Sequence, residues 1–332
     1  MFNFDREKYL ANEKKAAVNV VNDTVKMVDE ICAKGFSNIF YVGIGGTITY
    51  AWQMECIVKS HSTIKLYVEN AAEFVTVGNK NFTKDSIVVI ESASGDTKEV
   101  VAAVEYAHKA GAKVLGFIEK PESPLAKMVD YLVCNEGGTY YYWYAVTLRF
   151  MNKAGDFPQY DKLISEIQTA LPDALCAVKE KGDAQAEAYA EAYKDEPIQY
   201  LIGAGNLWGW AYCYAMCIME EMQWMRTKSV SGADFFHGTL EVIDRDTSVV
   251  LFKGEDDARP LMDRVEKFVN TISNKVTVFD SADFELKGIS PEFRGILSPF
   301  VLNALCKRVS KHLEWKRKHP LPIRRYYRRL DY

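Results

Sequence analysis

The feature that most restricts the fold of this chain is a pattern that occurs twice along it. The mostly apolar residues 38–42 lead into the sequence GIGGT at 43–47, and residues 198–202 lead into GAGN at 203–206. The first glycines of the two turns lie 160 positions apart, and a segment of helical character follows each turn. A strand, a glycine turn and a helix in each half predict two related α/β domains.

Short apolar segments in both halves predict further buried strands, separated by helical patterns. They are residues 63–68, 86–90, 113–118 and 130–134 in the first half, and 247–252 and 275–280 in the second. The glycine turns are expected to open helices at 49–60 and 207–227. Short apolar strands that alternate with helices form parallel sheets that helices cover on both faces. We therefore expect an α/β fold with parallel sheets.

The length of 332 residues exceeds the usual size of one hydrophobic core, which also favours two domains. The chain is 48% apolar, so it has enough side chains for two cores and is not a disordered chain. The expected organisation is an N-terminal helix (1–34), a first domain (35–155), a helical connector (156–196), a second domain (197–315) and an extended C-terminal tail (316–332).

The net charge, the hydropathy and the cysteine content argue against several classes of function. The chain carries 41 Lys and Arg against 45 Asp and Glu, a net charge of −4 that is unfavourable for general nucleic-acid binding. It has no apolar run of the ~20 residues that cross a membrane, and its start lacks the pattern of a secretion signal. Seven cysteines without paired spacing indicate a reducing compartment and no metal site. We therefore expect a cytoplasmic protein without nucleic-acid or membrane partners.

A cluster of hydroxyl side chains follows the expected strand at 86–90. The sequence ESASGDTKE at 91–99 places two serines, a threonine and Gly95 where a parallel strand meets a helix. The N–H groups and dipole of a helix N-terminus favour an anion, which Gly95 lets the backbone approach closely. No lysine directly follows this glycine, so the phosphate of a nucleoside triphosphate is not expected. The alternative is that these residues only cap a helix.

Two adjacent carboxylates, Glu220 and Glu221, follow the apolar segment 207–219. A carboxylate that apolar side chains surround can take a proton from carbon near neutral pH, so either is a candidate base. His237 lies 16 residues after Glu221, in the sequence ADFFHG at 233–238. Taken singly, the glutamate could be a surface charge and the histidine a structural side chain. Periodicity does not decide between the two glutamates.

Together these motifs resemble the sugar isomerase (SIS) domain family, in tandem over roughly residues 35–315. The resemblance rests on the turns at 43–47 and 203–205 and on the loop at 92–97. It implies a flavodoxin-like, five-stranded sheet in each domain and a phosphorylated sugar as ligand. The residues that it implies in phosphate binding are Ser92, Ser94 and Thr97, assisted by Gly45, Gly46, Thr47 and Ala93.

The isomerase half of glucosamine-6-phosphate synthase has a catalytic glutamate and a histidine at the same separation, so similarity to it implies that Glu221 and His237 are catalytic. This chain departs from the synthase in carrying Ile218 where the synthase has a lysine, and in having no cysteine before Cys32. It is more similar to the fructosamine-6-phosphate deglycases, including fructoselysine-6-phosphate deglycase. These proteins also end in a basic, tyrosine-containing tail like residues 323–332.

The deglycase resemblance implies the reversal of an Amadori rearrangement. Glu221 would take a proton from C1 of the sugar and return it to C2, while His237 would move a proton at the sugar oxygens. Hydrolysis of the resulting Schiff base gives glucose 6-phosphate and a free amine. No metal ion and no cofactor are expected. Two other functions stay open: an aldose–ketose isomerase of an amino sugar phosphate, and a non-catalytic sugar-phosphate sensor.

The resemblance also implies a homodimer or higher homo-oligomer whose subunits share active sites. His237 would then act in its own or in the partner subunit, and the C-terminal tail would cover the site. Glu136, in the loop at 135–139, is a candidate for selecting a cationic amine such as lysine. Nucleic-acid binding through the arginines of 324–329 is a remote alternative, because the chain as a whole is acidic.

Overall fold

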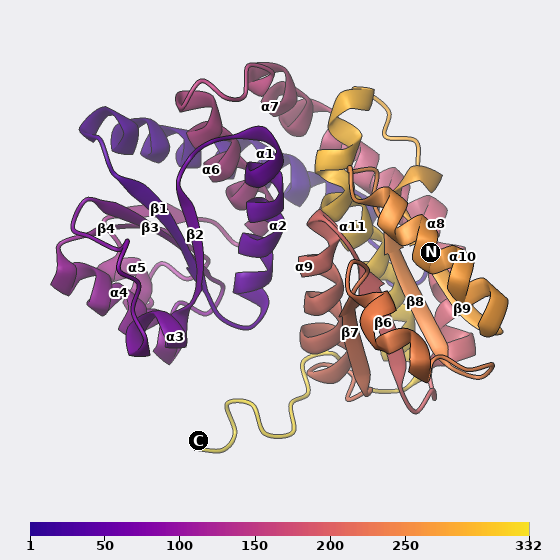
Figure 1. The fold of residues 1–332 in the computed structure, drawn as a ribbon. Coiled ribbons are helices and arrows are strands. Elements are labelled where there is room, and N and C mark those ends of the chain that lie inside the picture. The colour runs from indigo at the N-terminus through magenta and orange to yellow at the C-terminus, as the bar shows by residue number, and fades with distance from the viewer. Residues whose placement is uncertain (332) are drawn as a thin grey trace. The chain divides into compact units, whose positions relative to one another are not determined.

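The computed structural model describes residues 1–331 and divides into two compact units (Figure 1). The N-terminal unit comprises Glu7–Pro172, and the C-terminal unit joins Met1–Arg6 to Asp173–Tyr332. Tyr332, the last residue of the expected tail, lies outside the described residues. Within residues 1–331, no helix combines the length and the apolar character that crossing a membrane requires.

Five parallel strands form the sheet of the N-terminal unit, in the order β2-β1-β3-β4-β5. They are β1 (Asn38–Gly43), β2 (Leu66–Asn70), β3 (Ser86–Ser92), β4 (Lys113–Ile118) and β5 (Tyr131–Cys134). This is the flavodoxin-like order, so the expected fold is confirmed for this unit. The strand expected from residue 63 begins later, because the Asp156 carboxylate binds the backbone N–H of Thr63 at 2.7 Å and holds it in the preceding loop.

Helices cover both faces of this sheet. On one face pack α3 (Ala71–Thr76), α4 (Lys98–Ala110) and α5 (Pro124–Met128), over an apolar core that includes Phe40 of β1. On the other face lie α2 (Gly46–His61) and α6 (Thr139–Lys153), where the Tyr41 hydroxyl lies 2.8 Å from that of Thr147. Successive residues of a strand point to opposite faces, so Phe40 and Tyr41 belong to separate cores. The remaining helices are α1 (Arg6–Lys34) and α7 (Tyr160–Thr169).

Four parallel strands form the sheet of the C-terminal unit, in the order β7-β6-β8-β9. They are β6 (Gln199–Gly203), β7 (Thr227–Ser231), β8 (Ser248–Lys253) and β9 (Lys275–Asp280). The α-helices that accompany this sheet are α8 (Leu171–Tyr193), α9 (Asn206–Cys213), α10 (Arg259–Ile272) and α11 (Arg294–Lys316). The α/β class is confirmed, whereas the implied five strands per domain are wrong for this sheet in the part of the chain that the structure describes.

The connection from α9 to β7 differs from the sequence prediction. The helix expected over 207–227 is regular only in α9 and continues as a π-helical turn, Tyr214–Glu220. Trp224, with a left-handed φ of 54°, then leads the chain into β7. The sequence does not predict β7 because Val230 is the one buried residue of its five. The chain is therefore helical as far as Glu220, in the π form after Cys213, and the prediction of a helix is wrong for residues 221–227.

Candidate active site

The loop at 92–97 lies at the carboxyl edge of the N-terminal sheet. β1 and β3 are parallel neighbours, with Tyr41 beside Val89, so the turns that follow both strands lie at this edge. The helices that these turns open, α2 and α4, cover opposite faces of the sheet. Open α/β sheets bind their ligands at such a position, where two adjacent strands lead to helices on opposite faces of the sheet. The structure therefore places the turn at 43–47 and the loop at 92–97 at the position expected of a ligand site.

Within the loop, Ser92 and Gly95 stabilise the loop itself, whereas the other residues face outwards. The Ser92 side chain is 3% exposed, and its hydroxyl accepts a hydrogen bond from the backbone N–H of Gly95 at 3.0 Å. Ser94 and Thr97 are half-buried, with their hydroxyl oxygens 3.5 Å apart, and Ala93 is exposed. Thr97 is also the N-cap residue of α4. Ser94, Thr97 and the backbone at Ala93 can thus meet a phosphate, while Ser92 supports the loop.

Gly45, Gly46 and Thr47 form the turn into α2. Gly45 has a φ of 60°, and Gly46 is the first residue of the helix. The Thr47 hydroxyl accepts a hydrogen bond from the N–H of Ile44 at 3.0 Å and donates one to the carbonyl of Ile44 at 3.0 Å. Its proton is therefore used within the turn. Thr47 shapes the turn, and what the turn offers an anion is the N-terminus of α2.

Glu136 follows β5, which is not a neighbour of β3, the strand that leads into the loop at 92–97. It is exposed in the loop after β5, and β4 separates β5 from β3. The side-chain amide of Asn135 shapes this loop by donating to the carbonyl oxygens of Glu136 at 3.1 Å and Gly137 at 2.8 Å. Neighbouring strands are about 4.8 Å apart, so β5 lies about 10 Å from β3. Glu136 could contact only a part of a ligand that is distant from its phosphate.

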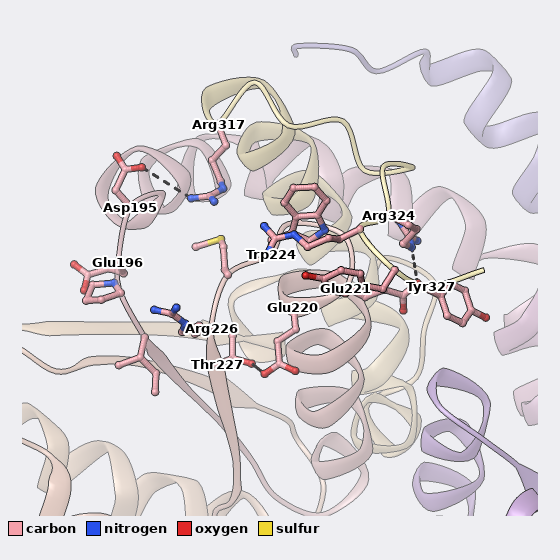
Figure 2. A pocket seen from close by; sticks show the side chains of 15 residues that line it. Asp195, Glu196, Glu220, Glu221, Trp224, Arg226, Thr227, Arg317, Arg324 and Tyr327 are labelled. Atoms are coloured by element: carbon pink, nitrogen blue, oxygen red, sulfur yellow. Dashed lines mark hydrogen bonds and ion pairs between the residues drawn. The ribbon is translucent and has the colours of Figure 1, made fainter. Parts of the chain in front are cut away.

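Glu221 lies directly after the π-helical turn of the C-terminal unit, and such turns are frequent at functional sites. Its side chain is 32% exposed, and Oε1 accepts a hydrogen bond from Nε of Arg324 at 2.7 Å (Figure 2). Oε2 has no hydrogen-bond partner within residues 1–331. The neighbouring Glu220 is exposed, and its Oε1 accepts a hydrogen bond from the hydroxyl of Thr227 at 2.6 Å. Glu221 thus contacts an arginine, a partner that the apolar segment 207–219 does not predict.

His237 lies at the other end of β7 from Glu221. Glu221 precedes Thr227, the first residue of β7, and His237 follows its last residue, Ser231. A five-residue strand spans about 13 Å. His237 itself is exposed, at the end of a short 3-10 helix. Within one chain, the two residues expected to be catalytic thus lie at opposite edges of the C-terminal sheet.

A cavity of about 960 Å³ opens beside Glu221 in the C-terminal unit, a volume that suits a small organic ligand. Its walls come from the chain before β6, from the turn at 220–227 and from the tail, which has neither helix nor strand between Lys316 and residue 331 (Figure 2). The tail contributes Arg324, Arg325, Tyr326 and Tyr327. Its basic character is evident from the sequence, whereas its contact with Glu221 is not, because 103 positions separate the two residues.

Two titratable groups next to this cavity have shifted pKa values. A hydrogen bond with Cys213 and burial together raise the pKa of the Cys217 thiol, so this thiol stays neutral. Burial lowers the pKa of His319, and the nearby charges of Arg317 and Arg325 lower it further. At neutral pH, the charges beside Glu221 are therefore those of carboxylates and arginines.

A comparison with known proteins finds a match between part of this chain and one protein family. Residues 34–152 match the family model described as SIS domain. This segment holds the five-stranded sheet together with the turn at 43–47 and the loop at 92–97. The resemblance to the SIS domain family is confirmed over this segment.

Particular relatives are similar over nearly the whole chain. Fructosamine deglycase FrlB of Bacillus subtilis (strain 168) is 29% identical over 330 residues, which cover 96% of this chain and 99% of that protein. Fructoselysine 6-phosphate deglycase of Escherichia coli (strain K12) is 22% identical, covering 91% and 88%. The solved structure of a proposed phosphosugar isomerase from Bacillus subtilis has a TM-score of 0.90 at 27% identity, covering 96% of this chain and 99% of its own.

Proposed function

We propose that this chain is a deglycase that cleaves fructosamine 6-phosphates, such as fructoselysine 6-phosphate, to glucose 6-phosphate and a free amine. The observation that carries the proposal is the Glu221 carboxylate, which is held at one oxygen and open at the other, beside a cavity of about 960 Å³. Similarity to two named deglycases over 96% and 91% of the chain supports it.

The chemistry requires one base and one proton donor. Oε2 of Glu221 takes a proton from C1 of the open-chain sugar, and the electron pair of the broken C–H bond forms the C1–C2 double bond of an enaminol. The carboxyl group then returns the proton to C2, which leaves a Schiff base at C1. Water adds to C1 and the amine departs. Ser94, Thr97 and the N-terminus of α4 are proposed to bind the phosphate of the substrate.

His237 is proposed to protonate the sugar oxygen at C2 in the active site of a partner subunit. In its own chain it lies at the opposite sheet edge from Glu221, and its exposure leaves the imidazole accessible to a second copy. A homodimer or higher homo-oligomer with shared sites is part of this proposal.

Sharing of sites can be tested with two inactive variants. Glu221→Gln and His237→Ala are each expected to be nearly inactive alone. When they are co-expressed as mixed dimers, about a quarter of the wild-type activity should return, because half of the dimers are mixed and each has one intact site. Mixing after folding, without subunit exchange, is the control. Activity that stays at the level of the single variants would overturn the placement of His237 in the partner's site.

The activity itself is tested by incubating the protein with fructoselysine 6-phosphate and measuring free lysine and glucose 6-phosphate. Equal amounts of both products are expected. Turnover of glucosamine 6-phosphate without release of amine from the fructosamine would instead indicate an aldose–ketose isomerase. Stabilisation of the protein by sugar phosphates with no turnover of a panel of fructosamine 6-phosphates would indicate a sensor.

Ser94→Ala is expected to raise KM about tenfold or more and to change kcat less. A hydrogen bond to a charged group contributes about 1.5–3 kcal/mol, and phosphate binding is equal in the ground and transition states. Calorimetric affinity for glucose 6-phosphate should fall by a similar factor. Ser60→Ala is the matched control, since Ser60 is exposed on α2 and binds the backbone of its own helix. Equal affinities of both variants would remove Ser94 from the phosphate site.

A further inference from the structure

The C-terminal tail is docked on the turn that carries Glu221. The side-chain amide of Gln223 donates to the carbonyl oxygen of His319 at 3.0 Å, and the His319 ring packs against Trp224 with ring centroids 4.3 Å apart. The guanidinium carbon of Arg325 lies 4.3 Å from the centroid of the same indole. Trp224 is 36% exposed, and it packs against two residues of the tail, so the turn and the tail are in direct contact.

Hydrogen bonds within the C-terminal tail fix the side chain of Arg324, which also contacts Glu221. Its Nη1 donates to the carbonyl oxygens of Leu321 at 2.6 Å and Ile323 at 3.1 Å. Leu321 is anchored in turn, because its N–H donates to Oε1 of Glu314 in α11 at 3.0 Å. These bonds direct Nε of Arg324 to Oε1 of Glu221, as the dashed line in Figure 2 shows. The Arg324 side chain is 18% exposed, so water competes little with this contact.

The other titratable groups around the cavity leave Arg324 as the counter-ion of Glu221. These groups come from the chain before β6, the π-helical turn, the turn at 220–227, the end of α11 and the tail. They are Asp195, Glu196, Cys217, Glu220, Arg226, Arg317, Arg325, Tyr326 and Tyr327. Within residues 1–331, Glu221 makes its one ion pair with Arg324. Glu220, next in sequence, opposes a second negative charge at Glu221, and Arg324 offsets that repulsion.

We propose that Arg324 is a positioning residue for the Glu221 base, an inference that rests on the proposed function. A glutamate has three side-chain torsions, and a base must meet its proton within hydrogen-bond reach. Arg324 binds Oε1 and so fixes the plane of the carboxylate, while Oε2 stays open to take the proton from C1. Because Arg324 belongs to the C-terminal tail, the Glu221 carboxylate is held in this orientation only while the tail is docked on the turn at 220–227.

The test compares Arg324→Gln and Arg324→Lys with Arg329→Gln, a matched control at an exposed arginine of the same tail. For fructoselysine 6-phosphate, kcat of Arg324→Gln is expected to fall about tenfold to a hundredfold with KM within about threefold, because misplacement by about 1 Å has costs of this size. Arg324→Lys, which keeps the charge without Nε, should be intermediate. Arg329→Gln should match wild type.

A second measurement does not depend on turnover. The N–H groups of His319 and Leu321 bond Glu314 of α11, and that of Ile323 bonds the carbonyl oxygen of Pro320. Hydrogen exchange at these three groups should be faster in Arg324→Gln than in wild type. Kinetics of Arg324→Gln equal to those of Arg329→Gln would overturn the positioning role while the deglycase activity stands. An inactive wild type would defeat the proposed function instead. In that case, exchange in Arg324→Gln equal to that in wild type would also show that the ion pair does not hold the tail.

Discussion

Replacing Glu221 by glutamine is expected to lower the rate of amine release from fructoselysine 6-phosphate by about a thousandfold. General-base catalysis contributes about 10²- to 10⁴-fold, and an amide cannot take the proton from C1. The change keeps the shape of the side chain, and its carbonyl oxygen can still accept the hydrogen bond from Nε of Arg324. The loss should therefore appear in kcat, while calorimetric affinity for glucose 6-phosphate stays within about threefold of wild type.

Glu220→Gln is the matched control for this experiment. Glu220 is adjacent in sequence and lines the same cavity, but it is exposed and its Oε1 binds Thr227. We expect its activity to remain within about threefold of wild type. An inactive Glu220→Gln beside an active Glu221→Gln would move the base to Glu220, and two active variants would remove both from the chemistry.

The parts of the fold that follow from local pattern were predictable from the sequence. The turns at 43–47 and 203–206 need glycine because Gly45 and Gly205 have φ values of 60° and 58°, and both positions open helices as expected. The strands at Lys113–Ile118 and Lys275–Asp280 have the predicted bounds. These elements depend on residues close together in the chain, so their composition is sufficient to identify them.

The parts that depend on hydrogen-bond register or distant partners were not predictable. An apolar run looks the same whether its N–H groups bond four or five residues back, so the π-helical turn at Tyr214–Glu220 leaves no signal in composition. The separation of Glu221 from His237 follows from β7, which has one buried residue and therefore resembles a loop in sequence. The contact with Arg324 joins two elements whose patterns are independent of each other.

Gly95→Ala is expected to disrupt the loop at 92–97, the proposed phosphate site, and to destabilise the protein by about 3 kcal/mol. Gly95 has a φ of 70°, where an L-residue costs about 1–2 kcal/mol. An added methyl group would also overlap Cβ and Oγ of Ser123, which cannot yield freely, because that hydroxyl donates to the carbonyl of Lys120 at 2.7 Å. The bonds of Gly95 to Ser92 and Leu125, both 3.0 Å, hold the loop, so its displacement should carry Ser94 away from the phosphate.

The expected result is a loss of affinity for glucose 6-phosphate of at least about thirtyfold, together with a lower melting temperature. Gly155→Ala separates the effect of backbone strain from that of the overlap with Ser123. Gly155 has a φ of 86°, but there is open space where its methyl group would lie. It should lose only the backbone contribution of about 1–2 kcal/mol and keep its affinity. Because a destabilised protein can still bind, affinity is measured well below the melting temperature of each variant. Wild-type affinity in Gly95→Ala would mean that sugar phosphates bind elsewhere than at the carboxyl ends of β1 and β3.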